Sequence, residues 1–425
     1  HTFHRLAITP YHQIGSTALW NKVFKKSFLI DHDIFCPEQI RYEDIFFCYL
    51  AFLYAQSYYR LDDVLYHYFV NPTGTVQRRK QEYQFDKMDI ALGFLKTCQV
   101  RGLYNASLQN RNAIDWMFLE KYYVYMLWEV FEEFPELKNT YSGFTFYPNT
   151  ISFSDSTNKA APALYGGYEY TPEQMNLRKD ELLLEKNNEA LLVLPKIFSD
   201  AGWQVTDFDP QNPNYSSTDD FSPFEGLHNT KVLSHVSGIS EKYISDHPEL
   251  SEFSNADLRV KKTLPKFAFL QMLVPIARNT YYNGAKYFSG EYIALSKDFI
   301  KSFSELYYLR QMTDFKAERN TYTIMHNMLT HNPTLLKQPG YMPSKNLSGI
   351  PAGSKCTYPY SIHNDYSDIK HYEVNASALL RIADWLNFLK ENHCYNNTKI
   401  IIVSDHGFRD TIQYLSPVFR KVFTD

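Results

Sequence analysis

Asp405 and His406 stand side by side near the end of the chain, and only Ser404 separates them from the apolar run of residues 400–403. A carboxylate oxygen and an imidazole nitrogen can bind one cation, and zinc and manganese both accept such ligands. Taken alone, the triplet that ends in Gly407 also fits a polar surface turn. Because sites in open α/β sheets form beyond the carboxyl ends of strands, the position after an apolar strand favours a metal site.

Thr157 is a candidate nucleophile or anion-binding residue. It follows Ser154 and Ser156, and a stretch of small residues comes after it. A hydroxyl at the start of a short helix stands where free N–H groups and positive potential attract an anion. The alternative is that Thr157 or Ser156 is an N-cap residue of that helix. Spacing alone does not choose among the three hydroxyls.

His331 is the third candidate, in the loop Thr330-His331-Asn332-Pro333. The loop follows the apolar stretch 321–325, which we predict to be a strand. A histidine at a strand end can bind an anionic oxygen. A solvated loop histidine is the alternative.

The elements that position these residues follow from hydrophobic periodicity. Residues 84–99 and 112–134 have apolar residues at helical spacing and predict helices. From residue 144 the pattern alternates between short apolar runs and helical or polar segments, with strands predicted at 190–194, 267–273, 321–325 and 399–403. This alternation predicts an α/β fold with mainly parallel strands. An amphipathic helix at 375–391 precedes the last of these strands, which is apolar throughout, as a strand covered on both faces should be.

The composition is that of an ordinary globular protein of two or three domains, with 425 residues, 44% apolar and 21% charged. A net charge of −4 gives no sign of a nucleic-acid partner. The longest charge-free apolar run near the front, residues 45–55, is about half of what a bilayer requires, so we expect no membrane span. The five cysteines include no CxxC pair and predict neither a disulfide framework nor a zinc knuckle. The chain begins at His1 without a signal peptide or an initiator Met, and we interpret it as a fragment.

Together, Thr157 with Pro162 five residues later, the loop at His331 and the Ser404–Gly407 ending resemble the alkaline phosphatase superfamily, in its sulfatase-domain branch. The similarity is greatest to lipoteichoic acid synthases and phosphoethanolamine transferases, and it runs from about residue 144 to the end. The runs 166–176 and 185–190 belong to it as well. The resemblance implies a sulfatase-like sheet sandwiched by helices.

The resemblance also implies roles for the candidate residues. Thr157 falls on the nucleophile, which also touches the metal, and Asp405 and His406 fall on metal ligands. His331 falls on a histidine that holds the phosphate or the leaving group. The implied cofactor is Mn or Zn, and the implied substrate is a phospholipid head group or an envelope glycan at the extracytoplasmic face of a bacterial envelope. A plain Thr, without the C/S-x-P-x-R motif of sulfatases proper, favours phosphoryl transfer over sulfate hydrolysis.

The sequence departs from this family in two ways. The family has an acidic metal ligand at the end of its first strand, and we find neither that strand nor that acid ahead of residue 144. Further groups usually follow the region around His406, but this sequence stops at Asp425. We therefore expect a sulfatase-like domain at 136–425 that is truncated at both ends.

The front of the chain resembles the acceptor-side half of family 2 glycosyltransferases. The matching residues lie in the runs 19–24, 34–38, 42–46 and 65–68. The resemblance makes Asp44 the catalytic base, because inverting transfer needs a carboxylate to deprotonate the sugar hydroxyl. An acidic residue in the first turn of a helix is the alternative. The nucleotide-binding half and its Asp-x-Asp motif are missing, so we predict a partial, mainly helical segment at 1–135.

Three functional hypotheses follow. The first is a phosphoryl or substituted-phosphoryl transferase or hydrolase that uses Thr157. The second is a glycosyltransferase for cell-surface polysaccharide, which would work in the cytoplasm. The third is an inactive chimeric fragment that acts, if at all, by binding. Metal content separates the first from the third, and sugar-nucleotide binding supports the second.

Overall fold

The chain divides into two compact units in a computed structural model. Unit 1 comprises His1–Ser156, Pro351–Tyr372 and Lys399–Asp425, and unit 2 comprises Thr157–Ile350 and Glu373–Thr398. The structure describes residues 3–5, 17–59, 61, 66–67, 69, 86–147, 152–154, 156–216, 220–234, 238–250, 256–282, 296–331, 336–337, 339–344, 367–407 and 418–421. The predicted boundary near residue 135 stays a prediction.

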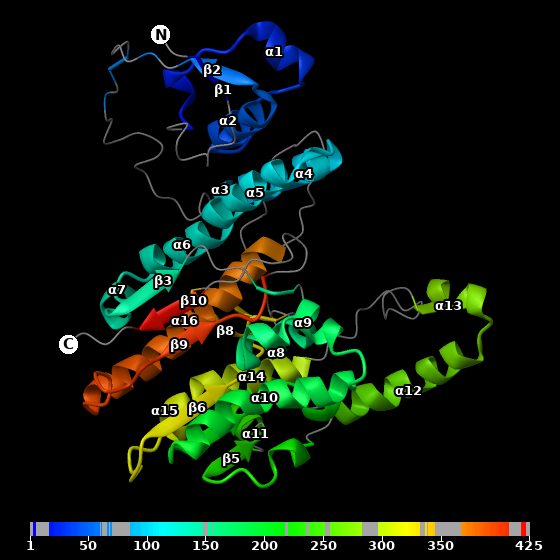
Figure 1. The fold of residues 1–425 in the computed structure, drawn as a ribbon, viewed down its shortest axis with the longest axis vertical. Coiled ribbons are helices and arrows are strands. Elements are labelled where there is room, and N and C mark those ends of the chain that lie inside the picture. The colour runs from blue at the N-terminus through cyan, green and yellow to red at the C-terminus, as the bar shows by residue number, and fades with distance from the viewer. Residues whose placement is uncertain are drawn as a thin grey trace. The chain divides into compact units, whose positions relative to one another are not determined.

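Unit 1 is mainly helical, as the apolar periodicity of its sequence predicts (Figure 1). Its long central helical segment runs from residue 108 to 133 and contains one π-helical stretch. The aromatic rings of Phe46 and Phe94 meet edge to face, 6.1 Å apart, and join two buried helices. The helical elements are η2 (Leu19–Asn21), α1 (Lys26–Asp31), α2 (Glu43–Tyr54), α3 (Asp86–Val100), α4 (Leu103–Ala106), α5 (Leu108–Phe118), η4 (Leu119–Val124), α6 (Tyr125–Glu133) and α7 (Leu137–Thr140).

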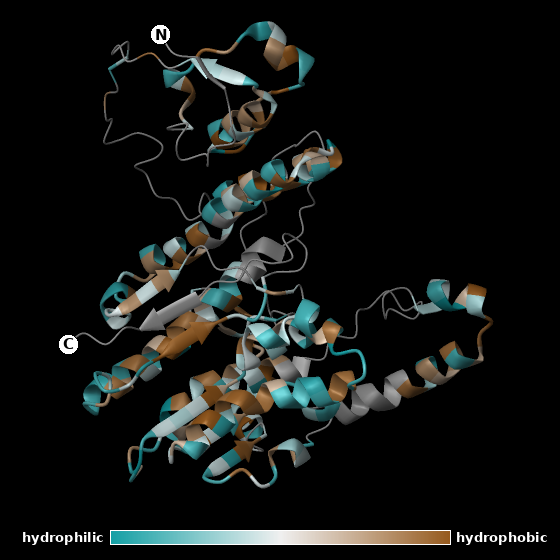
Figure 2. Cartoon of the chain, viewed as in Figure 1, coloured by the Kyte–Doolittle hydropathy of each residue, from teal (hydrophilic) through white to brown (hydrophobic). Residues whose placement is uncertain are grey.

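The strands of unit 1 are antiparallel. β1 (Phe3–Arg5) pairs with β2 (Ser57–Tyr59), and a second sheet has the order β3 (Phe144–Tyr147), β10 (Val418–Lys421), β9 (Ile401–Val403). The strand predicted at 399–403 is confirmed as β9. Its expected parallel neighbours and two-sided cover were wrong, because β10 pairs with it antiparallel and Ile401 is 58% exposed although the strand is apolar (Figure 2).

Unit 2 contains a parallel sheet with helices packed on both faces. Its order is β5 (Thr230–Leu233), β4 (Gln204–Phe208), β6 (Thr321–Met325). Tyr322 stacks on Phe198 of α10 with ring centroids 3.8 Å apart, whereas Met325 packs against the buried cluster around Phe303. Because side chains alternate between the faces of a strand, these two residues of β6 contact opposite layers. This is an α/β arrangement, and its assignment to the sulfatase-like fold stays a prediction.

A buried hydrophobic cluster of unit 2 joins α14 to the end of β6. It includes the fully buried Ile300 and Phe303 with Tyr243 and Leu329. The remaining elements of unit 2 are α8 (Thr157–Gly166), η5 (Tyr168–Tyr170), α9 (Pro172–Leu177), α10 (Leu183–Asp200), η6 (Pro213–Tyr215), η7 (Ser222–Phe224), α11 (Ile239–Asp246), α12 (Ala256–Met272), α13 (Pro275–Tyr282), α14 (Ser296–Tyr307), α15 (Leu309–Met312), β7 (Leu336–Lys337) and β8 (Met342–Pro343). The helix α16 (Ser367–Glu391) confirms the prediction for 375–391 and continues from unit 1 into unit 2.

Two predicted strands are helical. Residues 190–194 lie inside α10, and residues 267–273 lie largely inside α12. An apolar run of about five residues fits a buried strand or one face of a buried helix equally, and periodicity alone does not separate them. Within the described residues, no helix is long and apolar enough to cross a bilayer.

Candidate functional site

The turn after β9 holds Asp405 and His406 in a fixed mutual geometry. Asp405 Oδ1 accepts a hydrogen bond of 3.0 Å from the backbone N–H of His406. Ser404 Oγ donates to the carbonyl of His406 at 2.6 Å. Asp405 Oδ2 lies 3.8 Å from His406 Nε2, is buried, and has no hydrogen-bond partner among the described residues. A buried carboxylate oxygen without a donor is unfavourable unless a cation or an ordered water satisfies it.

The imidazole of His406 is oriented by its other nitrogen. Nδ1 lies 2.6 Å from the carbonyl oxygen of Gly407. A carbonyl only accepts, so Nδ1 carries the proton and, in the neutral ring, Nε2 carries the lone pair. Metal-binding histidines are commonly fixed in this way by a carbonyl on the opposite nitrogen. The ligand-type nitrogen therefore faces the buried oxygen of Asp405.

Thr157 is the first residue of α8 and is partly buried. The helix begins where the small-residue pattern predicts, and Ala160 and Ala163 lie on its buried side. The next residue, Asn158, accepts a 3.1 Å hydrogen bond at Oδ1 from Nδ2 of Asn212, in the loop after β4. The start of α8 is thereby attached to the carboxyl end of the parallel sheet, where α/β proteins form their sites.

The loop after β4 has an unusual backbone. Asp209, Asn212, Asn214 and Tyr215 all have φ between 46° and 58°, the left-handed region that non-glycine residues rarely occupy. Asn188 of α10 holds this loop through two hydrogen bonds to Asn214. Nδ2 of Asn188 donates to Oδ1 of Asn214 at 2.6 Å, and the backbone N–H of Asn214 donates to Oδ1 of Asn188 at 2.8 Å. Such a conformation persists only where its surroundings fix it, and it concentrates at functional sites.

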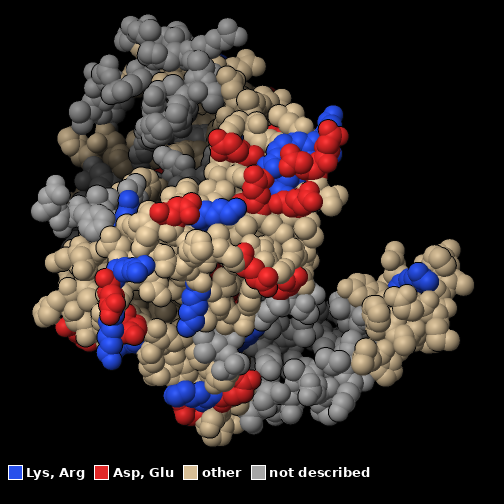
Figure 3. Space-filling view, turned by 60° about the horizontal axis from the view of Figure 1, so that its bottom comes forward, with Lys and Arg blue, Asp and Glu red and all other residues tan. Residues whose placement is uncertain are grey.

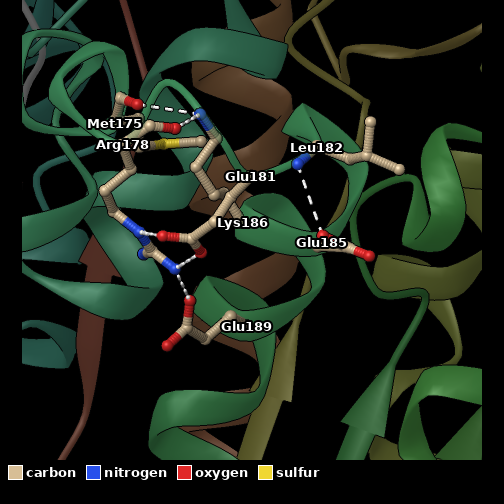
Figure 4. A network of polar contacts seen from close by, with 7 residues as sticks. All are labelled: Met175, Arg178, Glu181, Leu182, Glu185, Lys186 and Glu189. Carbon is tan, nitrogen blue, oxygen red and sulfur yellow. Dashed lines mark hydrogen bonds and ion pairs between the residues drawn. The ribbon is translucent and has the colours of Figure 1, made fainter.

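The run 185–190 lies in α10 and contacts the end of α9 through Lys186. Lys186 is buried, and its Nζ donates to the carbonyls of Met175 at 2.8 Å and Arg178 at 2.9 Å (Figure 4). It thus satisfies carbonyls at the end of α9, where positive charge is favourable. Arg178 pairs with Glu181 and Glu189 on the exposed side. Met175 lies in the run 166–176, and Lys186 and Glu189 lie in the run 185–190, so residues of both runs hold α9 against α10, the helix that carries Asn188.

His331 lies six residues beyond the end of β6. It is exposed, and its backbone N–H donates to the carbonyl of Met328 at 3.0 Å. The next two residues of its motif, at 332 and 333, lie outside the described residues. Thr157 and His331 both belong to unit 2, whereas Asp405 and His406 belong to unit 1. The structure therefore brings together the metal pair but describes no single site that contains all four residues.

Asp207 was missed in the sequence. It lies within β4 and is 3% exposed, and its Oδ1 has no hydrogen-bond partner among the described residues. Burial, followed by the nearby Asp209, raises its pKa from 3.8 to about 7. The signal that could have revealed the strand is the alternation of polar and apolar residues from Gln204 to Asp209, after the turn at Gly202. An acidic residue inside the strand obscures that pattern.

Asp44 lies in the first turn of α2, in unit 1. Burial, and then the adjacent Glu43, raise its pKa above the ordinary value, which favours proton acceptance by a general base. Burial lowers the pKa of Lys22, whose Nζ donates to the carbonyl of Ala18 at 3.0 Å. The charge of Lys22 opposes this rise in the pKa of Asp44, so the runs 19–24 and 42–46 of the front segment lie near each other.

A third run of that segment joins through aromatic stacking. The rings of Trp20 and Tyr66 stack with centroids 4.8 Å apart. Each of the two side chains is about half exposed.

Among the described residues, no group of three or more His, Cys, Asp and Glu side chains has the spacing of a metal site. Comparison of the chain with protein-family models, curated proteins and solved structures found no match.

Proposed function

We propose that residues 136–425 form a metal-dependent domain that cleaves or transfers a phosphate-type ester, with a phospholipid head group or an envelope glycan as substrate. One observation carries the proposal: Asp405 Oδ2 is buried without a donor, 3.8 Å from His406 Nε2. The motif resemblance supplies the reaction class and the roles of Thr157 and His331.

The Asp405–His406 pair fits a dication. Bonds of about 2.0–2.2 Å to oxygen and nitrogen at a tetrahedral angle hold the two ligand atoms roughly 3.4 Å apart. The observed distance of 3.8 Å is close to this value, and a small side-chain rotation would close the difference. Zinc and manganese both accept one carboxylate and one imidazole. When bound, such an ion polarises a phosphoryl oxygen and acidifies a coordinated hydroxyl. β3, the last described strand before Thr157, reads Phe-Thr-Phe-Tyr and contains no acidic ligand.

Thr157 would supply the nucleophilic oxygen. Its hydroxyl gives up its proton to solvent. Oγ forms a bond to phosphorus as the bond to the leaving group breaks, and the leaving oxygen departs with the electron pair. The positive end of the α8 helix dipole favours the negative charge of the phosphoryl oxygens. His331 would donate a hydrogen bond to an anionic oxygen. Water or an acceptor hydroxyl then takes the phosphoryl group from the covalent ester, which frees Thr157.

Hydrolysis of an aryl phosphodiester, assayed with manganese or zinc, tests the proposal. We expect turnover in the wild-type chain and its loss in Asp405→Asn. The matched control is Asp31→Asn, which changes an exposed carboxylate at the end of α1 in the same unit. Undiminished turnover in Asp405→Asn contradicts the proposal, and a wild-type chain inactive with both metals favours the inactive-fragment hypothesis.

A second proposal concerns the front of the chain. The Trp20–Tyr66 stack and the raised pKa of Asp44 support an acceptor-side glycosyltransferase segment with Asp44 as base. Aromatic faces about half exposed are suited to stacking against a sugar ring. This segment would transfer sugar only when a nucleotide-binding half is supplied, and addition of such a half in trans tests it.

A further inference from the structure

The junction between α12 and α13 exposes large apolar side chains. Ile276 is 91% exposed and Met272 is 82% exposed. Single exposed apolar residues are common, but a group of them on one surface marks an interaction site. Their neighbours on the two helices continue the apolar surface, and Figure 2 shows brown along the second half of α12. The exposed apolar residues are Leu264, Phe267, Phe269, Met272, Val274 and Ile276.

The junction is held by its own contacts. Phe269 of α12 packs edge to face against Tyr281 of α13, with ring centroids 5.1 Å apart. Arg278 donates from Nε to the carbonyl of Leu273 at 2.9 Å and from a terminal nitrogen to that of Gln271 at 3.2 Å. These bonds satisfy carbonyls at the end of α12. The apolar surface is therefore presented by a preformed corner of two helices.

The segment is basic. Residues 256–282, which α12 and α13 span, contain five basic residues and one acidic residue, Asp257. Figure 3 shows the lobe at the right as uncharged atoms with basic atoms and no acidic atoms on that face. The basic residues are Arg259, Lys261, Lys262, Lys266 and Arg278. Apolar bulk combined with positive charge is typical of helices that lie in the interface of an anionic membrane.

We propose that the α12–α13 corner docks onto an anionic lipid surface, with Met272, Val274 and Ile276 entering the acyl boundary. The charge of the segment decides between partners. A second copy of the chain would need a complementary acidic or neutral apolar face, whereas anionic head groups complement the excess of basic residues in the sequence of this segment. Docking would hold the chain at the bilayer, and it goes beyond the proposed ester chemistry.

Binding to vesicles tests this inference without any turnover assay. Full-length chain is sedimented with vesicles of phosphatidylglycerol and phosphatidylcholine in equal parts, and with phosphatidylcholine alone. We expect binding to the mixed vesicles, weakened by salt and by several-fold for each basic residue removed. Ile276→Asp should weaken it by at least about tenfold, because an isoleucine side chain no longer enters the apolar boundary.

The matched control is Ile197→Asp, which makes the same change at an isoleucine of α10 that is 56% exposed. It should bind vesicles like the wild-type chain. Equal loss in both variants, equal binding to the two kinds of vesicle, or no binding overturns the inference. So does self-association in the absence of lipid that Ile276→Asp abolishes, since the occupant is then a second copy.

Discussion

Asp405 bonds to the residue that follows it: its Oδ1 accepts from the backbone N–H of His406, while its Oδ2 lies 3.8 Å from Nε2 of the same histidine. One carboxylate oxygen thus fixes the turn, and the other is left buried beside a ligand-type nitrogen. The Gly407 carbonyl at Nδ1 sets the tautomer. The proposed metal ligands therefore lie in the turn that follows the apolar strand β9.

Thr157 should carry the covalent intermediate. Thr157→Ala removes the nucleophilic oxygen and should abolish turnover of an aryl phosphodiester, whereas Thr157→Ser should keep part of the rate. Ser154→Ala and Ser156→Ala should lose much less. Mass spectrometry of a trapped intermediate locates the adduct. A phosphate on Ser156, or full activity in Thr157→Ala, would refute the assignment.

Lys186 should be a structural residue. Lys186→Met leaves the carbonyls of Met175 and Arg178 without their buried donor, which should lower the free energy of unfolding by about 1–3 kcal/mol. Urea denaturation measures it. The control Lys196→Met changes an exposed lysine of the same helix and should stay within about 0.5 kcal/mol. Equal effects of the two variants would show that the buried bonds contribute nothing.

Asp207 should make stability depend on pH. Its pKa is about 7 in the folded chain against an ordinary 3.8, so the folded state holds its proton over a range where the unfolded state has lost it. Stability therefore falls as pH rises from about 4 to about 7, at about 1.4 kcal/mol per pH unit, and is level above.

Asp207→Asn removes that dependence. Its stability relative to the wild-type chain should rise between pH 5 and pH 7, measured by urea denaturation at each pH. Asp200→Asn, at an exposed aspartate at the end of α10, should show no such rise. A constant difference between Asp207→Asn and the wild-type chain across this range would mean that Asp207 is not protonated in the folded state.

The front segment should bind no sugar nucleotide by itself, because the residues ahead of the run 19–24 contain no Asp-x-Asp motif. Calorimetry with common sugar nucleotides should show no heat of binding, in the wild-type chain and in Asp44→Asn alike. A micromolar affinity in the wild-type chain would overturn this interpretation.

The sequence predicts the elements with a clear period and fails where the period is hidden. β6 occupies the predicted residues 321–325, and α16 contains the predicted helix. β4 was missed because Asp207 interrupts its apolar alternation. Residues 190–194 were assigned to a strand, yet they complete the buried face of α10, which a five-residue window does not reveal.

The candidate site is predictable only where its members are neighbours in sequence. Asp405 and His406 are adjacent, so their pairing follows from the motif. The bond between Asn158 and Asn212 depends on the left-handed loop after β4, and nothing in the spacing of two asparagines 54 residues apart predicts it. Long-range contacts of this kind arise from packing rather than from local pattern.

Metal content tests the central proposal most directly. The chain is loaded with manganese or zinc, freed of excess ion, and analysed by elemental mass spectrometry beside Asp405→Asn and the Asp31→Asn control. We predict one bound ion in the wild-type chain and the control, and none in Asp405→Asn, with circular dichroism unchanged. Equal metal stoichiometry in Asp405→Asn and the wild-type chain would contradict the proposal that Asp405 and His406 form the metal site.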